Sequence, residues 1–497
     1  MTRALVIAAP ASGSGKTTVA TGLMAALTRR GTSVAPFKIG PDYIDPGYHA
    51  LATGRPGRNL DPVLVGPALL GPLVRHGSAG CEIAVIEGVM GLFDGRVSDG
   101  AGSTAQVAGL VGAPVVLVVD CKGQSRSLAA LLHGFRSFDP ETRLAGVVLN
   151  RVGSPRHEEV LRAACDEVGL PVLGALPRRV ELAVPSRHLG LVTAAEHGDA
   201  ALAAVDAMAE LVGAHLDLDA VVRIAEPLPA GEVWDPAAAL ARDPGGPTSR
   251  LADVSRAPGA SRPGSVSAKA PADPARGQPG SGVVGVGTAT TRAADRPLRI
   301  GMLGGPAFSF GYAEHPELLA AAGAEVVTVD PLRDETLPWG TAGLVLPGGF
   351  PEEHVAALGQ NAGLLAAIRE LAASGAPIRA ECGGLLYLCR ELDGTPLVGA
   401  LDATAAMTGR LTLGYRDAVA LADSSGFAAG ERVPGHEFHH CAVTPRAGTP
   451  AAWGWRGGEP EGFVTGGVHG SFLHTHPAGS PGAVARFVDN AAAHAGS

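Results

Sequence analysis

The fold of the first half of the chain is decided by Leu5-Val-Ile-Ala-Ala-Pro-Ala-Ser-Gly-Ser-Gly-Lys-Thr-Thr18. Its apolar start predicts a buried strand, its small residues a loop, and the residues after it have helical spacing. Backbone N–H groups at such a helix N-terminus face phosphate oxygens. The Lys16 ammonium is expected to reach the outer phosphates and the Thr17 hydroxyl to ligate Mg²⁺. Pro10 stands where the usual pattern has glycine, so we predict a variant nucleotide-binding loop, with an ordinary strand–turn–helix as the alternative. The predicted ATP contacts in it are Ser12, Gly13, Ser14, Gly15, Lys16, Thr17 and Thr18.

Short apolar runs alternate with helix-like segments before residue 235. This pattern predicts a doubly wound, parallel α/β sheet, because parallel strands need crossover helices between them. Ligands bind such sheets at the carboxyl ends of the strands. The predicted strands are Ala4–Ala9, Val34–Ile39, Ile83–Glu87, Val115–Asp120, Leu144–Asn150 and Val172–Leu176.

A candidate ligand loop follows the second strand. It runs Lys38-Ile-Gly-Pro-Asp-Tyr-Ile-Asp-Pro-Gly-Tyr-His49 and is followed by Arg58-Asn-Leu-Asp61. Proline turns and three acids make a poor helix and a plausible binding loop. Each acid could hold Mg²⁺ or face substrate, or could simply form a turn with a solvated side chain. The basic residues Lys38, Arg55 and Arg58 are expected to pair with anionic ligands. The substrate candidates are Lys38, Asp42, Tyr43, Asp45 and His49, and Asp61 is a metal candidate.

Two polar residues end predicted strands. Glu87 precedes a glycine-rich loop, and a carboxylate beside a phosphate loop is the usual second ligand of Mg²⁺. The alternative is a carboxylate that caps a turn. Asn150 ends another strand where such folds often bind the purine edge, for which an amide offers both a donor and an acceptor. The predicted metal ligands are therefore Thr17, Glu87 and Asp61.

Composition and charge exclude several function classes. The chain has 497 residues, 18% of them charged and 46% hydrophobic, with a net charge of −9. This balance suits a globular enzyme and gives no basic surface for nucleic acid or anionic membrane. The six cysteines lack C-x-x-C spacing, so neither a disulfide framework nor a zinc site is indicated. No apolar run is long enough to span a bilayer, and we expect a cytoplasmic protein.

A compositional break divides the chain into two domains. No Phe, Trp or Tyr occurs from Asp235 to Ala307, and residues 255–297 are mainly Pro, Gly, Ser, Ala and Thr. Such a segment cannot bury enough apolar surface to offset its ordering entropy. We predict domains at 1–235 and 297–497, joined by a disordered linker at 236–296.

The second domain contains a candidate nucleophile. Cys382 lies at a sharp strand-to-helix turn, the nucleophile-elbow arrangement, flanked by Gly383 and Gly384. The glycines should leave the thiol exposed, and the helix N-terminus should favour thiolate. The N–H of Gly383 and one from Gly348 or Gly349 could form an oxyanion hole. A buried, unreactive cysteine is the alternative. Predicted strands around it are Leu298–Leu303, Glu325–Val329 and Gly343–Leu346, and predicted helices are Glu317–Ala322 and Leu364–Ala373.

Histidines near the C-terminus could act as the base that this nucleophile needs. Gly470-Ser-Phe-Leu-His-Thr-His476 supplies two imidazoles after an apolar strand. His436, His439 and His440 compete with them, or form a structural cluster, a substrate-facing cluster or a metal site. Spacing alone leaves these alternatives open.

With both sites in place, the chain resembles the cobyrinic acid a,c-diamide synthase family over nearly everything except the linker. The sister family, cobyric acid synthase, has a different loop after its strand-end glutamate. The first domain also looks like dethiobiotin synthetase. The resemblance is carried by Lys38–His49, Asn59-Leu-Asp61, Glu87-Gly-Val-Met-Gly-Leu-Phe-Asp-Gly95, Ala307-Phe-Ser-Phe310, Ala380-Glu-Cys-Gly-Gly-Leu-Leu-Tyr387, Leu413-Gly-Tyr415, Gly435-His-Glu-Phe-His439 and Leu473-His-Thr-His476.

The resemblance implies two doubly wound α/β domains, a phosphate-loop synthetase and a class I glutamine amidotransferase. Cys382, with His474 as base, would release ammonia from L-glutamine. The first domain would use ATP and Mg²⁺ to phosphorylate the a- and c-acetate carboxylates of hydrogenobyrinate or cobyrinate, and ammonia would displace each phosphate. The alternatives are another tetrapyrrole, other corrin carboxylates, or a non-catalytic nucleotide switch with a degenerate amidotransferase domain. Whether the corrinoid carries cobalt, and whether the protein forms a homodimer, stay open.

Two positions depart from the family pattern. The usual triad has Glu two positions after the base, and here that residue is His476, so the third member is unassigned. Gly304-Gly-Pro306 replaces a turn that often contains Asp.

Overall fold

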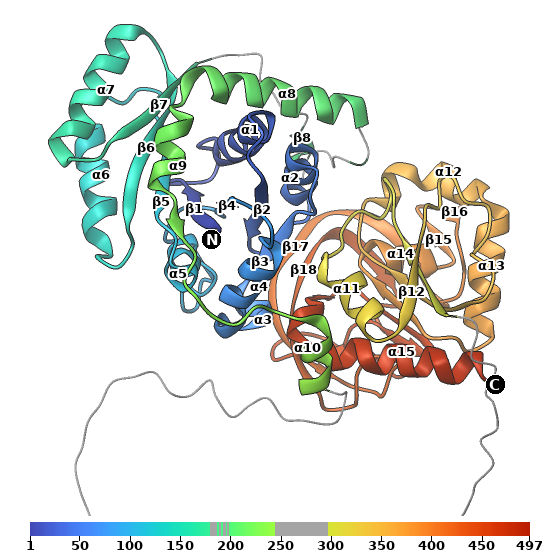
Figure 1. Cartoon of the computed structure of the whole chain (residues 1–497). Coiled ribbons are helices and arrows are strands. Elements are labelled where there is room, and N and C mark those ends of the chain that lie inside the picture. Colours follow the sequence, from blue (N-terminus) through green and yellow to red (C-terminus); the bar gives the residue numbers. More distant parts are fainter. Residues whose placement is uncertain (179–185, 188–189, 192–194, 196–197, 244–296) are drawn as a thin grey trace, which may run out of the picture.

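The protein has two lobes, seen side by side in the computed structural model (Figure 1). The structure describes residues 1–178, 186–187, 190–191, 195, 198–243 and 297–497. The first lobe is built from residues before 236 and the second from residues after 296. Both are α/β, as predicted.

The sheet of the first lobe has the strand order β3-β2-β4-β1-β5-β6-β7, all parallel, with β10 antiparallel against the start of β1. All six predicted strands are confirmed. β3 and β10 were missed because they are too short to show a hydrophobic pattern. The strands are β1 (Arg3–Ala8), β2 (Val34–Ile39), β3 (Arg58–Leu60), β4 (Ile83–Glu87), β5 (Val115–Asp120), β6 (Leu144–Val152), β7 (Val172–Pro177) and β10 (Glu226–Pro227), besides a separate pair, β8 (Ser186–Arg187) and β9 (Gly190–Leu191).

The register of this sheet brings the predicted ligand residues together. β4 lies between β1 and β2, with Glu87 opposite Ile7 on one side and Lys38 on the other. The central strands are buried along almost their whole length, as expected for a parallel sheet covered by helices. The helices are α1 (Lys16–Arg29), α2 (Asp45–Thr53), α3 (Pro62–Val65), α4 (Leu70–Gly77), α5 (Thr104–Val111), α6 (Ser127–Phe138), α7 (Pro155–Val168), α8 (Gly198–His215) and α9 (Leu218–Ile224), with a 3₁₀ turn η1 (Pro67–Leu69).

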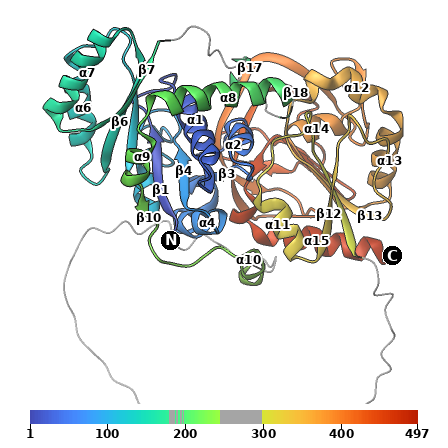
Figure 2. The same cartoon turned by 45° about the horizontal axis from the view of Figure 1, so that its top comes forward.

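The predicted linker begins with a helix, which corrects its boundary. α10 (Pro236–Arg242) has proline at its first position, and the Asp235 carboxylate accepts a hydrogen bond from Ala238 N at 2.7 Å. Both features favour helix initiation, and α10 packs against α11 and α15 of the second lobe (Figure 2). The remainder of the predicted linker, residues 244–296, lies outside the described residues.

The second lobe contains two six-stranded sheets. The first has the order β12-β11-β13-β14-β21-β20, with only β20 antiparallel, and it confirms the three predicted strands. Its strands are β11 (Leu298–Leu303), β12 (Ala324–Val329), β13 (Thr341–Leu346), β14 (Ile378–Glu381), β20 (Phe463–Thr465) and β21 (Val468–Ser471). The helices are α11 (Glu314–Ala321), α12 (Val355–Gln360), α13 (Ala362–Ala373), α14 (Gly383–Leu388) and α15 (Pro481–Ala495), with 3₁₀ turns η2 (Pro351–His354) and η3 (Pro477–Gly479).

The second sheet of this lobe is dominated by a long hairpin, β17 (Thr404–Ala420) and β18 (Arg432–Thr444). These strands curve along the border with the first lobe (Figure 1). β18 pairs with β22, which sets His436 opposite His474. The other strands are β15 (Glu391–Leu392), β16 (Thr395–Pro396), β19 (Trp453–Gly454) and β22 (His474–Thr475).

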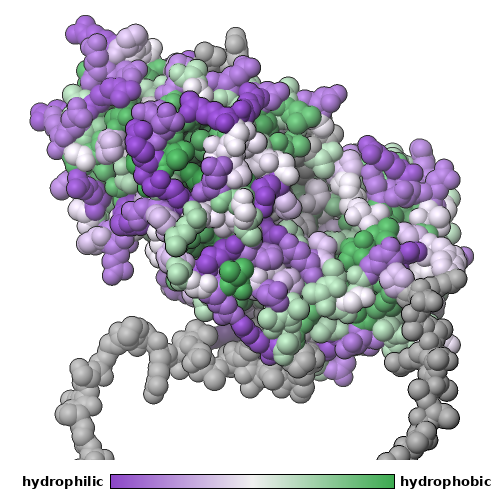
Figure 3. All heavy atoms as spheres, viewed as in Figure 1, coloured by the Kyte–Doolittle hydropathy of each residue, from purple (hydrophilic) through white to green (hydrophobic). Residues whose placement is uncertain are grey.

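Hydrophilic and hydrophobic residues are interspersed over the visible face of both lobes (Figure 3). Among the described residues, no helix combines the length and apolar character needed to cross a bilayer.

Candidate active sites

The loop after β1 has the backbone of a phosphate cradle. Gly13 and Gly15 have positive φ angles of 76° and 98°, and α1 begins immediately afterwards. A Cβ atom at Gly15 would lie 2.2 Å from Nδ2 of Asn150, so a larger residue does not fit there. Lys16 Nζ donates to the carbonyl oxygens of Met90 and, at 3.5 Å, Ala11. Burial and the neighbouring Lys38 lower the pKa of Lys16.

Asn150 braces this loop. Its Nδ2 donates to Ser14 O at 2.9 Å, and its Oδ1 accepts from Arg151 N at 2.8 Å. The side chain therefore lies directly beside the predicted phosphate site. That it also contacts a purine stays a prediction.

Glu87 is the centre of a buried charged cluster at the end of β4. Its Oε1 accepts from Thr17 Oγ1 at 2.7 Å and from Lys38 Nζ at 2.9 Å, and its Oε2 lies 2.7 Å from His49 Nε2. Burial alone would raise the pKa of Glu87, but Lys38 and His49 hold it well below its usual value. Glu87 is therefore a carboxylate beside the first turn of α1.

The candidate substrate acids approach the same cluster through Lys38. Lys38 Nζ lies 2.6 Å from Asp45 Oδ2 and 3.9 Å from Asp42 Oδ2. Burial would lower the pKa of Lys38, but Asp45 and Glu87 outweigh it and raise the pKa. Four of the five substrate candidates therefore lie in one cluster with the metal candidates Thr17 and Glu87. These four are Lys38, Asp42, Asp45 and His49.

The oxygen donors of this cluster fit Mg²⁺. Thr17 and Glu87 offer a hydroxyl and a carboxylate next to the loop, and Asp45 Oδ2 lies 3.5 Å from Thr17 Oγ1. Within the described residues, no set of three or more His, Cys, Asp or Glu side chains is arranged to hold a metal by itself. Mg²⁺ typically takes one or two protein ligands and completes its shell with water and phosphate oxygens.

Asp61 has a different role from the predicted one. Its Oδ1 caps α3 by accepting from Val63 N at 2.8 Å and Leu64 N at 3.2 Å, and its Oδ2 accepts from Tyr415 of the second lobe at 2.9 Å. Since both oxygens are engaged in these contacts, the structure does not support Asp61 as a ligand beside Thr17 and Glu87.

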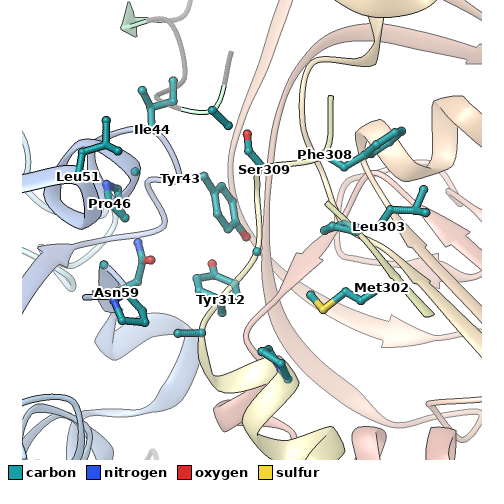
Figure 4. A pocket seen from close by; sticks show the side chains of 18 residues that line it. Tyr43, Ile44, Pro46, Leu51, Asn59, Met302, Leu303, Phe308, Ser309 and Tyr312 are labelled. Carbon is teal, nitrogen blue, oxygen red and sulfur yellow. The ribbon is translucent and has the colours of Figure 1, made fainter. Parts of the chain in front are cut away.

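Tyr43 lies apart from the other four substrate candidates. Its ring packs against rings of the second lobe, and its centroid lies 5.2 Å from that of His474. Figure 4 shows the ring of Tyr43 beside Tyr312 of that lobe. A cavity of about 470 Å³ opens beside it, lined by both lobes. The labelled lining residues are Tyr43, Ile44, Pro46, Leu51 and Asn59 from the first lobe and Met302, Leu303, Phe308, Ser309 and Tyr312 from the second.

Cys382 occupies a nucleophile elbow. Its φ and ψ angles are 50° and −105°, its N–H donates to Ser471 O at 2.8 Å, and α14 begins at the next residue. The residue is only 5% exposed, so the expected exposed thiol is wrong. Burial raises the pKa of Cys382, Glu352 adds to the shift, and the Gly383 N–H only partly opposes it. A raised pKa favours the thiol over the thiolate at this position.

The predicted oxyanion-hole glycines lie between the nucleophile and the base. An added Cβ at Gly383 would lie 2.9 Å from Gly349 N, and one at Gly348 would lie 2.6 Å from Cε1 of His474. Only glycine permits both close approaches. The oxyanion role of these N–H groups stays a prediction.

His474 is the imidazole next to Gly348, where an added Cβ would meet its Cε1 and Nε2. His436 stacks on it with ring centroids 4.9 Å apart. Glu381 Oε2 lies 3.6 Å from His474 Nδ1, while Oε1 of the same carboxylate is held by Arg379 at 2.8 Å. Burial would raise the pKa of Glu381, but Arg379 and His474 hold it well below its usual value. The sequence analysis missed Glu381, although its signal was its place directly before the nucleophile.

The other histidines have structural partners. His476 Nδ1 accepts from Ala478 N at 3.2 Å, and burial lowers its pKa to about 4. The His439 ring stacks on Phe472 at 3.8 Å, and its Nδ1 lies 2.9 Å from Cys441 O. Half-buried His440 accepts a hydrogen bond from Thr408 through its carbonyl.

Two family models match the two lobes. The model described as CobQ/CobB/MinD/ParA nucleotide binding domain matches residues 5–192, and the one described as CobB/CobQ-like glutamine amidotransferase domain matches residues 299–481.

Curated relatives match along the whole chain. Hydrogenobyrinate a,c-diamide synthase of Streptomyces coelicolor is 58% identical over 98% of this chain and 96% of its own length. The synthase of that name from Mycobacterium tuberculosis is 54% identical over 98% of each chain. Cobyrinate a,c-diamide synthase of Syntrophotalea carbinolica is 38% identical over 98% of each chain.

Proposed function

Because this chain belongs to the hydrogenobyrinate and cobyrinate a,c-diamide synthase family, we propose that residues 1–235 form an ATP-dependent synthetase domain and residues 297–497 a glutaminase domain. The protein is a glutamine-hydrolysing ligase of cobalamin biosynthesis. The observation that carries the assignment of the sites is that one lobe has a phosphate loop with Glu87 beside it and the other has a nucleophile elbow with His474 nearby, while Tyr43 of the first lobe contacts His474 across the domain border. Hydrogenobyrinate is the proposed substrate, since the relatives named for it share the higher identity.

In the glutaminase domain, Cys382 Sγ attacks the side-chain amide carbon of glutamine. His474 accepts the thiol proton and returns it to the leaving ammonia, which gives a glutamyl thioester that water hydrolyses. A base is needed because burial keeps Cys382 protonated. The N–H groups of Gly383 and Gly349 stabilise the oxyanion, and Glu381 orients His474 through Nδ1.

In the synthetase domain, the loop amides and Lys16 bind the ATP phosphates. Mg²⁺ held by Thr17 and Glu87 would neutralise charge on the transferring phosphoryl group. Lys38, between the acids of the cluster, is placed to pair with the acceptor carboxylate. A carboxylate is a poor electrophile, and its phosphorylation turns one oxygen into a leaving group. Ammonia then forms the amide and phosphate leaves.

The test is mass spectrometry of the corrinoid product with ATP and Mg²⁺. The wild type should convert two carboxylates of hydrogenobyrinate to amides, with ¹⁵N entering from amide-labelled glutamine. Cys382→Ala should lose the reaction with glutamine and keep it with ammonium, while the control Cys81→Ala, a thiol of the first lobe, should behave as wild type.

Other outcomes would overturn the proposal. If neither hydrogenobyrinate nor cobyrinate gains amides from either nitrogen donor, the substrate assignment fails. More than two amides would indicate a cobyric acid synthase activity. If the protein binds ATP but forms no amide, the result would support the alternative of a non-catalytic nucleotide switch.

A further inference from the structure

Tyr43 belongs to the synthetase domain but packs inside the glutaminase domain. It lies between β2 and α2, and it is almost completely buried. Its ring stacks on Phe310 at 5.2 Å between centroids, and it contacts the rings of Tyr312, His436 and His474 at 5.0, 5.8 and 5.2 Å. Figure 4 shows this ring reaching across the domain border towards Tyr312.

The backbone of Tyr43 is tied to the acid cluster. Asp42 Oδ1 accepts from Ile44 N at 2.8 Å and from Asp45 N at 3.2 Å, which folds the chain tightly around Tyr43. Asp45 binds Lys38, and Lys38 binds Glu87. A movement of either aspartate therefore moves the tyrosine backbone between them.

His474 receives this ring contact from outside its own domain. Gly348, His436 and Glu381, which surround its imidazole, all belong to the glutaminase domain. In the described part of the chain, the ring contact of His474 that comes from the synthetase domain is that of Tyr43. Further contacts between the domains, among them Arg58 to Glu314 at 2.7 Å and Tyr415 to Asp61 at 2.9 Å, hold the two domains together around it.

We infer that Tyr43 is a positioning residue for His474, through which the acid cluster of the synthetase controls glutamine hydrolysis. The inference rests on the proposed function and deepens it. When substrate or Mg²⁺ occupies the cluster, Asp42 and Asp45 adjust, and the ring of Tyr43 sets the imidazole in its productive orientation. Ammonia is then made only when an acceptor is ready, which avoids its loss by protonation in water.

The experiment compares full-length wild type, Tyr43→Leu and Tyr43→Phe. Glutamine hydrolysis is measured with glutamine alone and with ATP, Mg²⁺ and hydrogenobyrinate added, and amidation is measured with ammonium. In wild type the synthetase ligands should stimulate hydrolysis. In Tyr43→Leu the ratio of stimulated to basal hydrolysis should fall to about one, with kcat reduced by about tenfold or more and KM for glutamine little changed, because small misplacements of a catalytic group are costly. Amidation with ammonium should stay within about threefold of wild type.

Tyr43→Phe keeps the ring and serves as the matched control. Tyr43→Phe should retain the stimulation of glutamine hydrolysis by the synthetase ligands. Loss of that stimulation in Tyr43→Phe would refute a role for ring packing. An unchanged ratio in Tyr43→Leu, no stimulation in wild type, or an equal loss of the ammonium reaction would also overturn the inference. Failure of the proposed function looks different, since wild type would then form no amide even with ammonium.

Discussion

Oε2 of Glu381 lies 3.6 Å from Nδ1 of His474, so a partly buried carboxylate faces the proposed base from the residue that precedes the nucleophile. The usual third triad member follows the base by two positions, and here His476 occupies that place and caps η3 instead. Glu381 reaches His474 from another strand because it pairs with Ser471 of β21, and His474 follows Ser471 by three positions. A carboxylate in this position fixes the imidazole tautomer and stabilises the imidazolium.

Glu381→Gln is expected to lower kcat of glutamine-dependent amidation by about 100-fold, because a neutral amide cannot stabilise the imidazolium. Amidation with ammonium should change by less than about twofold, since the synthetase site is untouched. Steady-state kinetics with both nitrogen donors measure the difference. Glu325→Gln, which removes a carboxylate from a partly exposed pair with Arg299, is the control. An equal loss with both donors would instead indicate general damage to the fold.

Gly348→Ala tests the glycine between the nucleophile and the base. The new methyl group would lie 2.6 Å from Cε1 of His474 and must displace the ring. We expect the rate of glutamine hydrolysis to fall by about tenfold or more, with amidation from ammonium preserved. Gly134→Ala in α6, where nothing lies within 4 Å of the added atom, should leave both rates unchanged. Normal glutamine hydrolysis by Gly348→Ala would argue against this placement of His474.

The sequence predicted strands best where both faces of the sheet are buried. β2, β4, β5 and β11 agree with the prediction residue for residue, because a parallel sheet between helices is apolar throughout. The hairpin of β17 and β18 was missed. Much of β17 is exposed and contains Gly409 and Gly414, so it has neither a continuous apolar run nor a clear alternation.

The candidate sites also contain parts that the sequence could predict and parts that it could not. The phosphate loop and the nucleophile elbow were predictable because each is formed by a few consecutive residues. Tyr43 and Arg58 were not, since their partners lie more than 250 positions later in the chain. Arg58 was expected to pair with an anionic ligand, and its anions are instead Glu314 and Glu317 of the second lobe.

Arg58→Met should destabilise the association of the two lobes. Arg58 pairs with Glu314, whose side chain is 1% exposed, and removal of the guanidinium leaves that carboxylate buried without its partner. We expect a loss of about 3 kcal/mol in the free energy of unfolding, measured with urea. Arg126→Met, which breaks a surface pair with Glu167, should cost less than about 1 kcal/mol. Similar losses in the two variants would contradict a structural role for the buried pair.

The proposed Mg²⁺ site can be tested through its hydroxyl ligand. Chelation of divalent cations should abolish amidation with either nitrogen donor. Thr17→Ala should raise by about tenfold the Mg²⁺ concentration that half-saturates amidation with ammonium, because it removes one of the few protein ligands. Thr17→Ser keeps a hydroxyl at the position 2.7 Å from Glu87 and should resemble wild type. An unchanged Mg²⁺ requirement in Thr17→Ala would remove Thr17 from the metal site.

Stability should also depend on pH through Glu461, which binds Ser471, the residue that accepts a hydrogen bond from the N–H of Cys382. Burial raises the pKa of Glu461 to about 7, although its carboxylate accepts hydrogen bonds from Phe472 N and Ser471 Oγ at 2.8 and 2.7 Å. The folded state holds the proton on Glu461 more tightly than the unfolded chain does. The stability that this proton contributes is therefore complete below about pH 4.5 and is lost as the pH rises through 7.

Glu461→Gln removes this titration while keeping a side chain of the same shape. Relative to wild type, the variant should therefore gain about 2 kcal/mol in the free energy of unfolding between pH 5 and pH 8. Urea unfolding at the two pH values measures the gain, and Glu210→Gln on the exposed face of α8 should show none. If the difference between Glu461→Gln and wild type is the same at both pH values, Glu461 does not change its protonation on folding. Its carboxylate would then stay charged behind the elbow, and the hydrogen bonds from Ser471 and Phe472 would be what stabilises that charge.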